Sequence, residues 1–445
     1  MATLPEKVIT QNWGNPDSHT FASYSKAGGY TALKKALAMT PAQVTDEVKR
    51  SNLRGRGGAG FPTGLKWSFV PKDNPKPKYL AVNADESEPG TFKDRCILER
   101  DPHMMLEGIA IAAYALDVHT AYIYIRGEFK HPAERVNAAL REAYAQGVFG
   151  KSVLGSGYPL EVYVVRGAGA YICGEETALL ESLEGKKGWP RLKPPFPAVV
   201  GLFGSPTVVN NVETLAAVPH IINKGAEWFA KLGTEKSGGT RLVCLSGSVN
   251  RPGVFEISLH TTVKELIFDD AFGQGMPKGR SVKAVIPGGS SAPVLGADEI
   301  DVALEFEALK AKQNMAGSGG VIVMDDSTCM VRCLWRVVRF YAEESCGQCT
   351  PCREGAPWLT RVLRKIEEGR GEPADLDVML NVANAIAPFP PMGLGTTICA
   401  LGDSIALPTH SFLARFRDEF EAHITQHRCP FGEKPWGHYG EGRPS

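Results

Sequence analysis

Short apolar runs and amphipathic stretches alternate through the first half of the chain. The apolar runs are rich in β-branched and aromatic residues and predict strands at 79–83, 121–125 and 160–165. Apolar residues at helical spacing predict helices at 41–50, 103–116, 132–145 and 175–183. Because strands that alternate with helices form parallel sheets, we expect an α/β unit with helices on both faces of a parallel sheet.

The pattern changes near Thr240. Short apolar runs predict strands at 242–246, 253–257 and 282–286 and a helix at 263–268, which is typical of a small α+β unit. From residue 326 onward the apolar positions recur at helical spacing, as at Val331, Leu334, Trp335, Val338 and Tyr341. Further helices are predicted at 354–366, 376–386 and 407–424, and a four-helix bundle is the simplest arrangement.

Two segments follow neither pattern. The proline-rich segment 190–197 can be neither a helix nor a central strand, so an ordered, extended strap is expected. The residues before the helix at 41–50 are expected to form a mobile arm. The fold class is therefore multidomain α/β, divided into 1–63 (arm, helix and glycine-rich loop), 64–235 (α/β), 236–325 (α+β) and 326–445 (helical bundle and C-terminal tail).

Charge and length exclude some functions. Among 445 residues, 49 basic and 49 acidic side chains cancel, so no net field attracts nucleic acid or an anionic membrane. The longest strongly apolar stretch, 108–116, is far shorter than the roughly 20 residues that span a bilayer. No signal peptide is visible, and a cytosolic protein is expected. Its 10 cysteines are then thiols and ligands in preference to disulfides.

The strongest chemical signal is a run of three cysteines, Cys346, Cys349 and Cys352, each separated by two residues. A compact run of three with a distant fourth is typical of a single 4Fe–4S cluster, whereas zinc usually takes two separate pairs. Zinc remains an alternative occupant. The fourth ligand is predicted to be Cys399, because it follows a glycine-rich loop that permits the close approach a cluster needs. Cys429, near the C-terminal tail, is the competing choice.

Cys329 and Cys333 lie one helical turn apart, which could in principle be a metal pair. Both stand among apolar residues, so buried thiols are the favoured interpretation.

The first glycine-rich loop comprises Gly55, Arg56, Gly57, Gly58, Ala59 and Gly60. It follows a predicted helix instead of a strand, so its dinucleotide-binding pattern is weak evidence alone. Its backbone N–H groups can nevertheless approach a phosphate or a flat ring, and Arg56 and Lys66 add charge. Phe61 and Phe69 offer aromatic faces for stacking, whereas Trp67 is assigned to the core.

A second glycine-rich loop, 166–176, joins a predicted strand to a helix, which is where open α/β sheets bind ligands. Glu175 and Glu176 stand in the first helical turn, where they either complement the helix dipole or hold ribose hydroxyls or a nicotinamide amide. The end of the strand at 79–83 carries Asn83 and the acidic segment 85–88, as a solvated turn or a ligand site. The amides of Asn210 and Asn211 suit a ring edge.

Four motifs together resemble one family, the NADH-binding flavoprotein subunit (F type, 51 kDa type) of respiratory complex I, NADH:quinone oxidoreductase. They are 54–67, 83–94, 167–176 and 343–355, and the similarity runs from about residue 25 to 420. The resemblance implies a Rossmann-like domain that binds FMN and NADH, a ubiquitin-like (SLBB-type) α+β domain, and a helical bundle that carries one 4Fe–4S cluster.

The resemblance also implies residue roles. FMN would lie between the first glycine loop, the strand end with Asn83, Asp85 and Glu86, and the Asn210–Asn211 segment. Phe61, Phe69 and Phe196 would flank the adenine of NADH, and Glu88, Tyr171 and Glu176 would shape the nicotinamide side as catalytic residues. Lys66, Gly174, Glu175 and Lys193 are further cofactor-binding candidates.

The implied function is the conversion of hydride transfer into single-electron transfer, from NADH through FMN and the cluster to partner clusters and finally quinone. Expected partners are a thioredoxin-like 2Fe–2S subunit and a large multi-cluster iron–sulfur subunit, in an assembly on the inner face of the cell membrane. One alternative is the diaphorase subunit of a soluble NAD-linked hydrogenase or formate dehydrogenase. Another is a cluster-bearing scaffold or nucleotide sensor without turnover.

Overall fold

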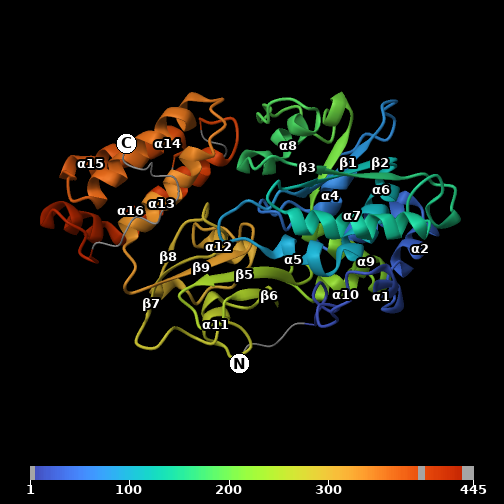
Figure 1. Cartoon of the computed structure of the whole chain (residues 1–445), viewed down its shortest axis with the longest axis horizontal. Helices are drawn as coiled ribbons and strands as arrows, with labels where there is room; N and C mark the ends of the chain where they lie inside the picture. The colour runs from blue at the N-terminus through green and yellow to red at the C-terminus, as the bar shows by residue number, and fades with distance from the viewer. Residues whose placement is uncertain (1–5, 389–395, 433–445) are drawn as a thin grey trace.

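The computed structural model describes residues 6–388 and 396–432. The predicted C-terminal tail beyond residue 432 and the glycines at 393 and 395 that precede Cys399 lie outside the described residues. Three groups of elements are visible in Figure 1: a first sheet with its helices on the right, a second sheet at the lower centre, and a group of C-terminal helices at the upper left.

The first sheet has four parallel strands in the order β3-β2-β1-β4. They are β1 (Tyr79–Ala84), β2 (Thr120–Ile125), β3 (Glu161–Arg166) and β4 (Thr207–Asn211). Successive residues of a strand enter different cores: Leu80 and Val82 lie with helices α6 (Pro102–Leu116) and α9 (Val212–Lys224), whereas Ala81 lies with α8 (Glu176–Leu183). The predicted parallel sheet with helices on both faces is therefore confirmed.

Shorter helices complete this group. They are α3 (Pro41–Arg50), α4 (Thr63–Ser68), α5 (Lys93–Arg100), α7 (Lys130–Ala145) and α10 (Ala226–Lys231). The helices predicted at 41–50, 103–116, 132–145 and 175–183 are confirmed to within two residues. The sequence interpretation did not include α4, α5, α9, α10 or β4.

The expectation of a mobile N-terminal arm is wrong for the residues described. Helices α1 (Phe21–Lys26) and α2 (Thr31–Leu37) precede α3. Val8 and Ile9 are buried, and their backbone N–H groups donate to the carboxylate of Glu256 at 2.9 and 3.0 Å. The acceptor lies some 250 positions away, so no local pattern could have indicated this attachment.

The second sheet has five strands in the order β6-β5-β9-β7-β8. They are β5 (Arg241–Gly247), β6 (Gly253–Ile257), β7 (Val282–Ile286), β8 (Leu295–Gly296) and β9 (Gly320–Asp325), with helices α11 (Val263–Phe268) and α12 (Phe306–Ala311). The predicted helix and the three predicted strands are confirmed. The sequence interpretation missed β9, although it is the central strand and pairs with both β5 and β7.

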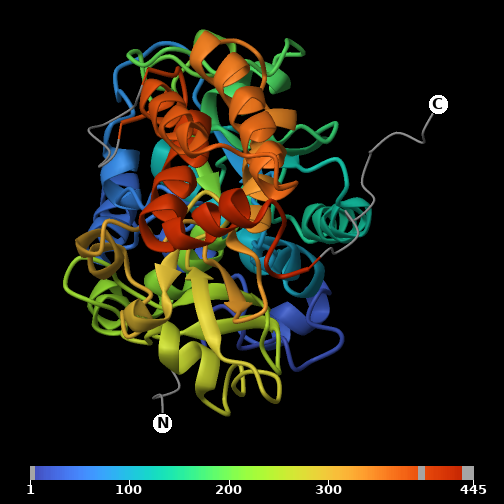
Figure 2. The same ribbon diagram turned by 90° about the vertical axis from the view of Figure 1, so that its left-hand side faces the viewer.

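The C-terminal helices are α13 (Met330–Glu343), α14 (Thr350–Glu367), α15 (Pro373–Ile386) and α16 (Leu401–Gln426). Figure 2 shows them, in orange to red, above the second sheet in yellow. Their buried residues Leu334, Leu363 and Ile405 belong to one core that also includes Leu180 of α8 and Ile286 of β7. This shared core joins the three groups and fixes how the loops between them meet.

Candidate functional site

One cavity of about 410 Å³ lies where the three groups meet. Its lining includes the first glycine loop, the carboxyl end of β1, the loop after β3, the end of β4 and the start of α16. The predicted site residues among them are Arg56, Gly57, Gly58, Ala59, Asn83, Asp85, Glu86, Glu88, Tyr171, Gly174, Glu175, Asn211 and Cys399. Motifs separated by more than 300 positions are thus brought to one place.

The first glycine loop closes on itself between α3 and α4, because Gly55 N–H donates to Phe61 O at 2.9 Å. Gly58 has φ +139°, a conformation that L side chains rarely adopt. No described residue accepts a hydrogen bond from the N–H groups of Gly57, Gly58 or Ala59. Three unpaired backbone donors at a cavity form a suitable cradle for an anionic or polar ligand group.

The guanidinium of Arg56 has a structural partner set. Nη2 donates to Gly238 O at 2.8 Å and to Thr240 O at 3.0 Å, and the side chain is buried. Burial lowers the pKa of Arg56 to about 10. These bonds tie the glycine loop to the start of the second sheet, so the expectation that Arg56 directly offers its charge to a ligand is wrong.

The end of β1 supplies three polar side chains with different local roles. Asn83 donates to Gly174 O at 2.8 Å and so joins the two predicted loops. Burial raises the pKa of Asp85 to about 7, and its Oδ2 has no hydrogen-bond partner among the described residues. Glu86 accepts from the N–H groups of Asp94 and Arg95 at 2.8 and 2.9 Å, which caps the start of α5. Asp85 is therefore the carboxyl group that stays available to a ligand.

Glu88 and Tyr171, both predicted as catalytic, form a hydrogen-bonded pair. Tyr171 Oη donates to Glu88 Oε2 at 2.7 Å, and Tyr341 Oη donates to the other oxygen, Oε1, at 3.0 Å. Ser291 N–H donates to the same Oε1 at 2.7 Å. Burial, with a contribution from Glu88, raises the pKa of Tyr171 well above its usual value, so the phenol is a neutral donor.

Two lysines surround the acidic pair at the start of α8. Lys193 Nζ lies 3.1 Å from Glu175 Oε1 and 2.9 Å from Glu176 Oε1, and Lys66 Nζ lies 3.4 Å from Glu176 Oε2. Burial opposes ionisation of Glu176, but the two lysines outweigh it and lower its pKa. Glu175 Oε2 also accepts from Thr177 N–H at 2.8 Å and caps the helix. Both acids are therefore anionic and locally neutralised.

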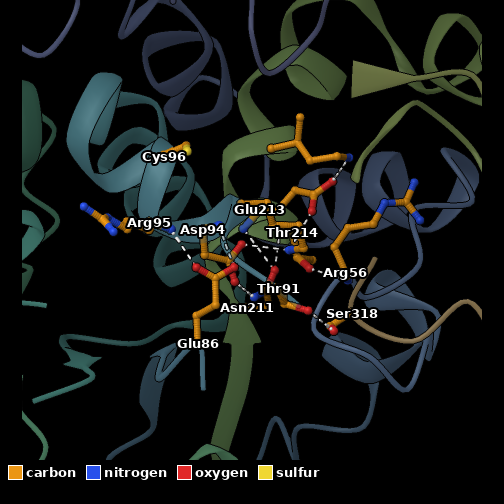
Figure 3. Close-up of polar contacts among 12 residues, drawn as sticks. Arg56, Glu86, Thr91, Asp94, Arg95, Cys96, Asn211, Glu213, Thr214 and Ser318 are labelled. Carbon is orange, nitrogen blue, oxygen red and sulfur yellow. Dashed lines mark hydrogen bonds and ion pairs between the residues drawn. The ribbon is translucent and has the colours of Figure 1, made fainter. Parts of the chain in front are cut away.

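A second charge network, drawn in Figure 3, lies behind the end of β4. Asn211 Nδ2 donates to Asp94 at 2.6 Å, and its Oδ1 accepts from Glu213 N–H at 3.0 Å. Lys93 Nζ lies 2.8 Å from Asp94 and 2.7 Å from Glu213. Burial opposes protonation of Lys93, but Asp94 and Glu213 raise its pKa. This network fixes Asn211 and places a buried cation at the cavity.

Asn210 does not line the cavity. Its Oδ1 accepts from the indole N–H of Trp67 at 2.9 Å, and both side chains are buried. Trp67 is thus in the core as expected.

The three phenylalanines proposed for adenine stacking also stand outside the cavity lining. Phe61, Phe69 and Phe196 are 45%, 50% and 58% exposed, and the rings of Phe61 and Phe69 lie 6.0 Å apart. Exposed aromatic rings beside a polar cavity are unusual enough to suggest a stacking surface.

The cysteine run occupies the turn between α13 and α14. Gly347 has φ +74°, which lets the chain reverse between Cys346 and Cys349. Burial raises the pKa of Cys352 to about 11 and that of Cys399 to about 12, and Cys346 contributes to both. Cys399, not Cys429, therefore lies beside the run. Four converging thiols, with Cys352 and Cys399 buried, fit the ligand set of a 4Fe–4S cluster.

Sequence reasoning missed several residues that line the cavity. They are Thr91, Lys93, Asp94, Ser291, Met315, Gly317, Ser318, Asp403, Ser404 and Leu407. Lys93 and Asp94 follow the acidic strand end closely and could have been found from that motif. The others come from later elements that reach the cavity only through tertiary packing.

Two sequence profiles match regions on either side of this geometry. Residues 48–220 match the Nuo51 FMN-binding domain, and residues 332–423 match the NADH-ubiquinone oxidoreductase-F iron-sulfur binding region. The first contains the glycine loop and the strand ends, and the second contains all four clustered cysteines. The chain is therefore an oxidoreductase component with sites for FMN and a 4Fe–4S cluster.

Full-length comparisons define the family. The chain is 54% identical to the second F subunit of the NADH-quinone oxidoreductase of Rhizobium meliloti (strain 1021), over 96% of this chain and 99% of the relative. It is 49% identical to the F subunit of the NADH-quinone oxidoreductase of Mycobacterium tuberculosis (strain ATCC 25618 / H37Rv), over 97% and 96%. The chain belongs to the family of NADH-quinone oxidoreductase F subunits.

A solved structure has the same fold. It is an NAD⁺-reducing [NiFe]-hydrogenase in the H₂-reduced state, with a TM-score of 0.81 and 34% identity, covering 94% of this chain and 67% of the hydrogenase chain. Within the described part of this chain, no helix combines the length and apolar character needed to cross a bilayer.

Proposed function

We propose that this chain is the NADH-oxidising entry subunit of an NADH:quinone oxidoreductase. The observation that carries the proposal is the shared wall of the cavity: the glycine loop, Asp85 and Tyr171 line the same space as the cluster cysteine Cys399. FMN at such a site supplies the chemistry that accepts a hydride and releases electrons singly, and a 4Fe–4S cluster accepts them singly. The side chains around the cavity bind and orient the reactants.

The proposed binding roles follow from the contacts. The free N–H groups of Gly57, Gly58 and Ala59 would bind polar groups of FMN, while Asn83, Asp85 and Asn211 would hold its other polar edge. Gly55, Gly60 and Gly174 would permit close approach of the backbone; a Cβ on Gly174 would lie 3.2 Å from Asp85 O. The exposed rings of Phe61, Phe69 and Phe196 would stack on the adenine of NADH.

The nicotinamide side is assigned to Glu88, Tyr171 and Glu176. The Glu88–Tyr171 pair presents a fixed carboxylate and a neutral phenol, which suit the amide of the ring. Glu176 is held between Lys66 and Lys193, so its charge is fixed without repelling a dinucleotide phosphate strongly. Burial of Glu88 and Tyr171 under Tyr341 and Ser291 excludes water from this end.

The division into domains belongs to the same proposal. Residues 64–235 would form the Rossmann-like domain, 236–325 the ubiquitin-like domain and 326–445 the cluster-binding bundle, with 1–63 contributing the arm, helix and loop. The partners would be a thioredoxin-like 2Fe–2S subunit and a large multi-cluster subunit, in an assembly on the inner face of the cell membrane.

The enzyme hypothesis is tested on protein purified without oxygen. NADH is expected to bleach the flavin absorbance band within mixing time, and chemical analysis is expected to give about four irons per chain. A flavin-free protein, or flavin that NADH does not bleach near neutral pH, would contradict turnover and favour a scaffold or sensor. Zinc in place of iron at the cysteine run would contradict the cluster.

A second candidate is the diaphorase subunit of an NAD-linked hydrogenase, because the solved structure that matches is an NAD⁺-reducing hydrogenase. Proteins recovered with the chain from its native source distinguish the two. Membrane-embedded quinone-reducing partners support the first proposal, and a nickel–iron subunit supports the second.

A further inference from the structure

A second group of metal-binding side chains lies away from the flavin cavity. It consists of Cys329, Glu367, His423 and Cys429, whose ligand atoms all lie within 4.8 Å of one another. Cys329 is the N-cap of α13, Glu367 ends α14, His423 lies near the end of α16, and Cys429 follows it. Four segments of the chain therefore converge on one point.

The spacing of the atoms suits a small tetrahedral ion. Cys329 Sγ lies 3.3 Å from both Glu367 Oε2 and His423 Nε2, and these two atoms lie 3.3 Å apart. Ligand atoms on a tetrahedral zinc, with bonds of about 2.0–2.3 Å, are separated by roughly 3.3–3.8 Å. Cys329, Glu367 and His423 are all buried, which is an unusual place for such groups without a common partner.

The surroundings orient the histidine and balance the charge. His423 Nδ1 lies 2.7 Å from Glu419 O, and donation to this carbonyl leaves Nε2 as an electron-pair donor toward the other three groups. Arg332 binds the outer oxygen of Glu367, Oε1, at 2.6 Å through Nε. Two thiolates, one carboxylate and Arg332 would neutralise a divalent ion completely.

This group is separate from the cluster cysteines. Cys352 is in the first turn of α14 and Glu367 is its last residue, and the helix has 18 residues. Its ends are therefore roughly 25 Å apart. Two cysteines are too few for a second 4Fe–4S cluster, and a mixed sulfur, nitrogen and oxygen set is typical of zinc.

We propose that Cys329, Glu367, His423 and Cys429 form a structural Zn²⁺ site that joins the starts and ends of the C-terminal helices. The site goes beyond electron transfer: zinc has no redox chemistry, so its effect is to fix α13, α14, α16 and the segment after α16 relative to one another. It also assigns Cys429, which competed with Cys399 in the sequence, to a different metal.

The test is metal analysis of the full-length protein purified from cells grown with added zinc and dialysed against a mild chelator. We expect about one zinc per chain besides the cluster iron, and X-ray absorption at the zinc edge should show two sulfurs at about 2.3 Å and two lighter ligands at about 2.0–2.1 Å. This measurement needs no variant. Less than about a tenth of a zinc per chain, a fifth iron instead of zinc, or a zinc shell without sulfur would overturn the proposal.

The variant Cys429→Ser should lower zinc at least about fivefold while leaving iron and flavin unchanged. Cys333→Ser is the matched control, because Cys333 is on the same helix as the Cys329 cap but its Sγ contacts Met324 Sδ at 3.3 Å instead of the group. It should keep its zinc. Retention of zinc in Cys429→Ser, or equal loss in both variants, would contradict the assigned ligands. Because iron and flavin are measured in the same samples, failure of the zinc site is distinguishable from failure of the proposed function.

Discussion

At the scale of single residues, the cavity is built from charged groups that are buried in pairs. Glu176 lies between two lysines, Lys93 lies between two carboxylates, and Glu88 receives two phenols. Buried charges are costly unless they are paired and hydrogen-bonded, so each pair stabilises a fixed arrangement instead of a flexible one. Removing one partner is therefore expected to disturb the other.

Tyr171→Phe removes the hydroxyl that donates to Glu88 at 2.7 Å. A hydrogen bond to a charged group contributes about 1.5–3 kcal/mol, so kcat/KM for NADH with an artificial one-electron acceptor should fall by about tenfold or more. Tyr341→Phe is the control, because Tyr341 binds the same carboxylate at 3.0 Å but does not line the cavity. An equal loss in both variants would show that Tyr171 acts only by holding Glu88.

Asp101 gives a pH dependence of stability away from the cavity. It is fully buried, its Oδ2 accepts from Asn12 at 2.8 Å, and burial raises its pKa to about 7 from the ordinary 3.8. Between these values the unfolded chain has lost the proton that the folded chain retains, so stability falls as pH rises and is constant above about pH 7. The whole window corresponds to about 4 kcal/mol, and the part above pH 5.5 to about 2 kcal/mol.

Asp101→Asn removes this titration. From pH 5.5 to 8, the melting temperature of the wild type relative to the variant should therefore fall, as followed by differential scanning calorimetry. Asp46→Asn, which changes an exposed carboxylate on α3, should show no such trend. Parallel melting curves for Asp101→Asn and the wild type at every pH would refute the assignment of a raised pKa.

At the scale of elements, local pattern was sufficient wherever an element has strong periodicity and clear ends. The helix at 41–50 has a threonine cap and a capping box with Gln43, and its bounds were predicted correctly. β9 was missed because its apolar run is short and its pairing with β5 and β7 is long-range. The side chain of Arg56 was misjudged for the same reason, since its acceptors lie at 238 and 240.

The site showed the same division. Residues next to glycine turns and strand ends were found, because their chemistry is unusual for a surface loop. The zinc ligand group was not found as a unit, since Cys329, Glu367, His423 and Cys429 share no spacing and meet only when three helices pack. Cys329 was accordingly interpreted as an ordinary buried thiol.

Gly58→Ala tests the glycine loop as an element. A Cβ at Gly58 would meet nothing within 4 Å, so the change acts only through the backbone at φ +139°. Strain of this kind costs about 1–3 kcal/mol, and relaxation of the loop should weaken FMN binding by about tenfold in a fluorescence titration of flavin-free protein. Gly157→Ala is the matched control: it has φ +81° with equally open space, but Gly157 does not line the cavity. Equal flavin affinity in Gly58→Ala and the wild type would remove the loop from the binding site.

At the scale of the whole molecule, the chain places its metal centres at the two ends of one helical group. The end with Cys346, Cys349, Cys352 and Cys399 faces the flavin cavity, and the end with Cys329 and Cys429 faces away from it. The electron-transfer end thus needs to be close to a neighbouring site, whereas the other end needs only to be rigid.

Exchange of one cysteine at each end should therefore separate the two centres. Cys399→Ser should remove most of the iron and the electron paramagnetic resonance signal of the reduced cluster, since Cys399 is beside the run and no other described cysteine is placed to replace it. NADH should still bleach the flavin of this variant, but transfer to partner clusters should fall at least about a hundredfold because the exit is lost. Zinc should remain, whereas Cys429→Ser should show the reverse pattern, with a normal cluster signal and no zinc. A cluster signal that survives in Cys399→Ser and disappears in Cys429→Ser would mean that the fourth cluster ligand is Cys429, and both assignments would then be wrong.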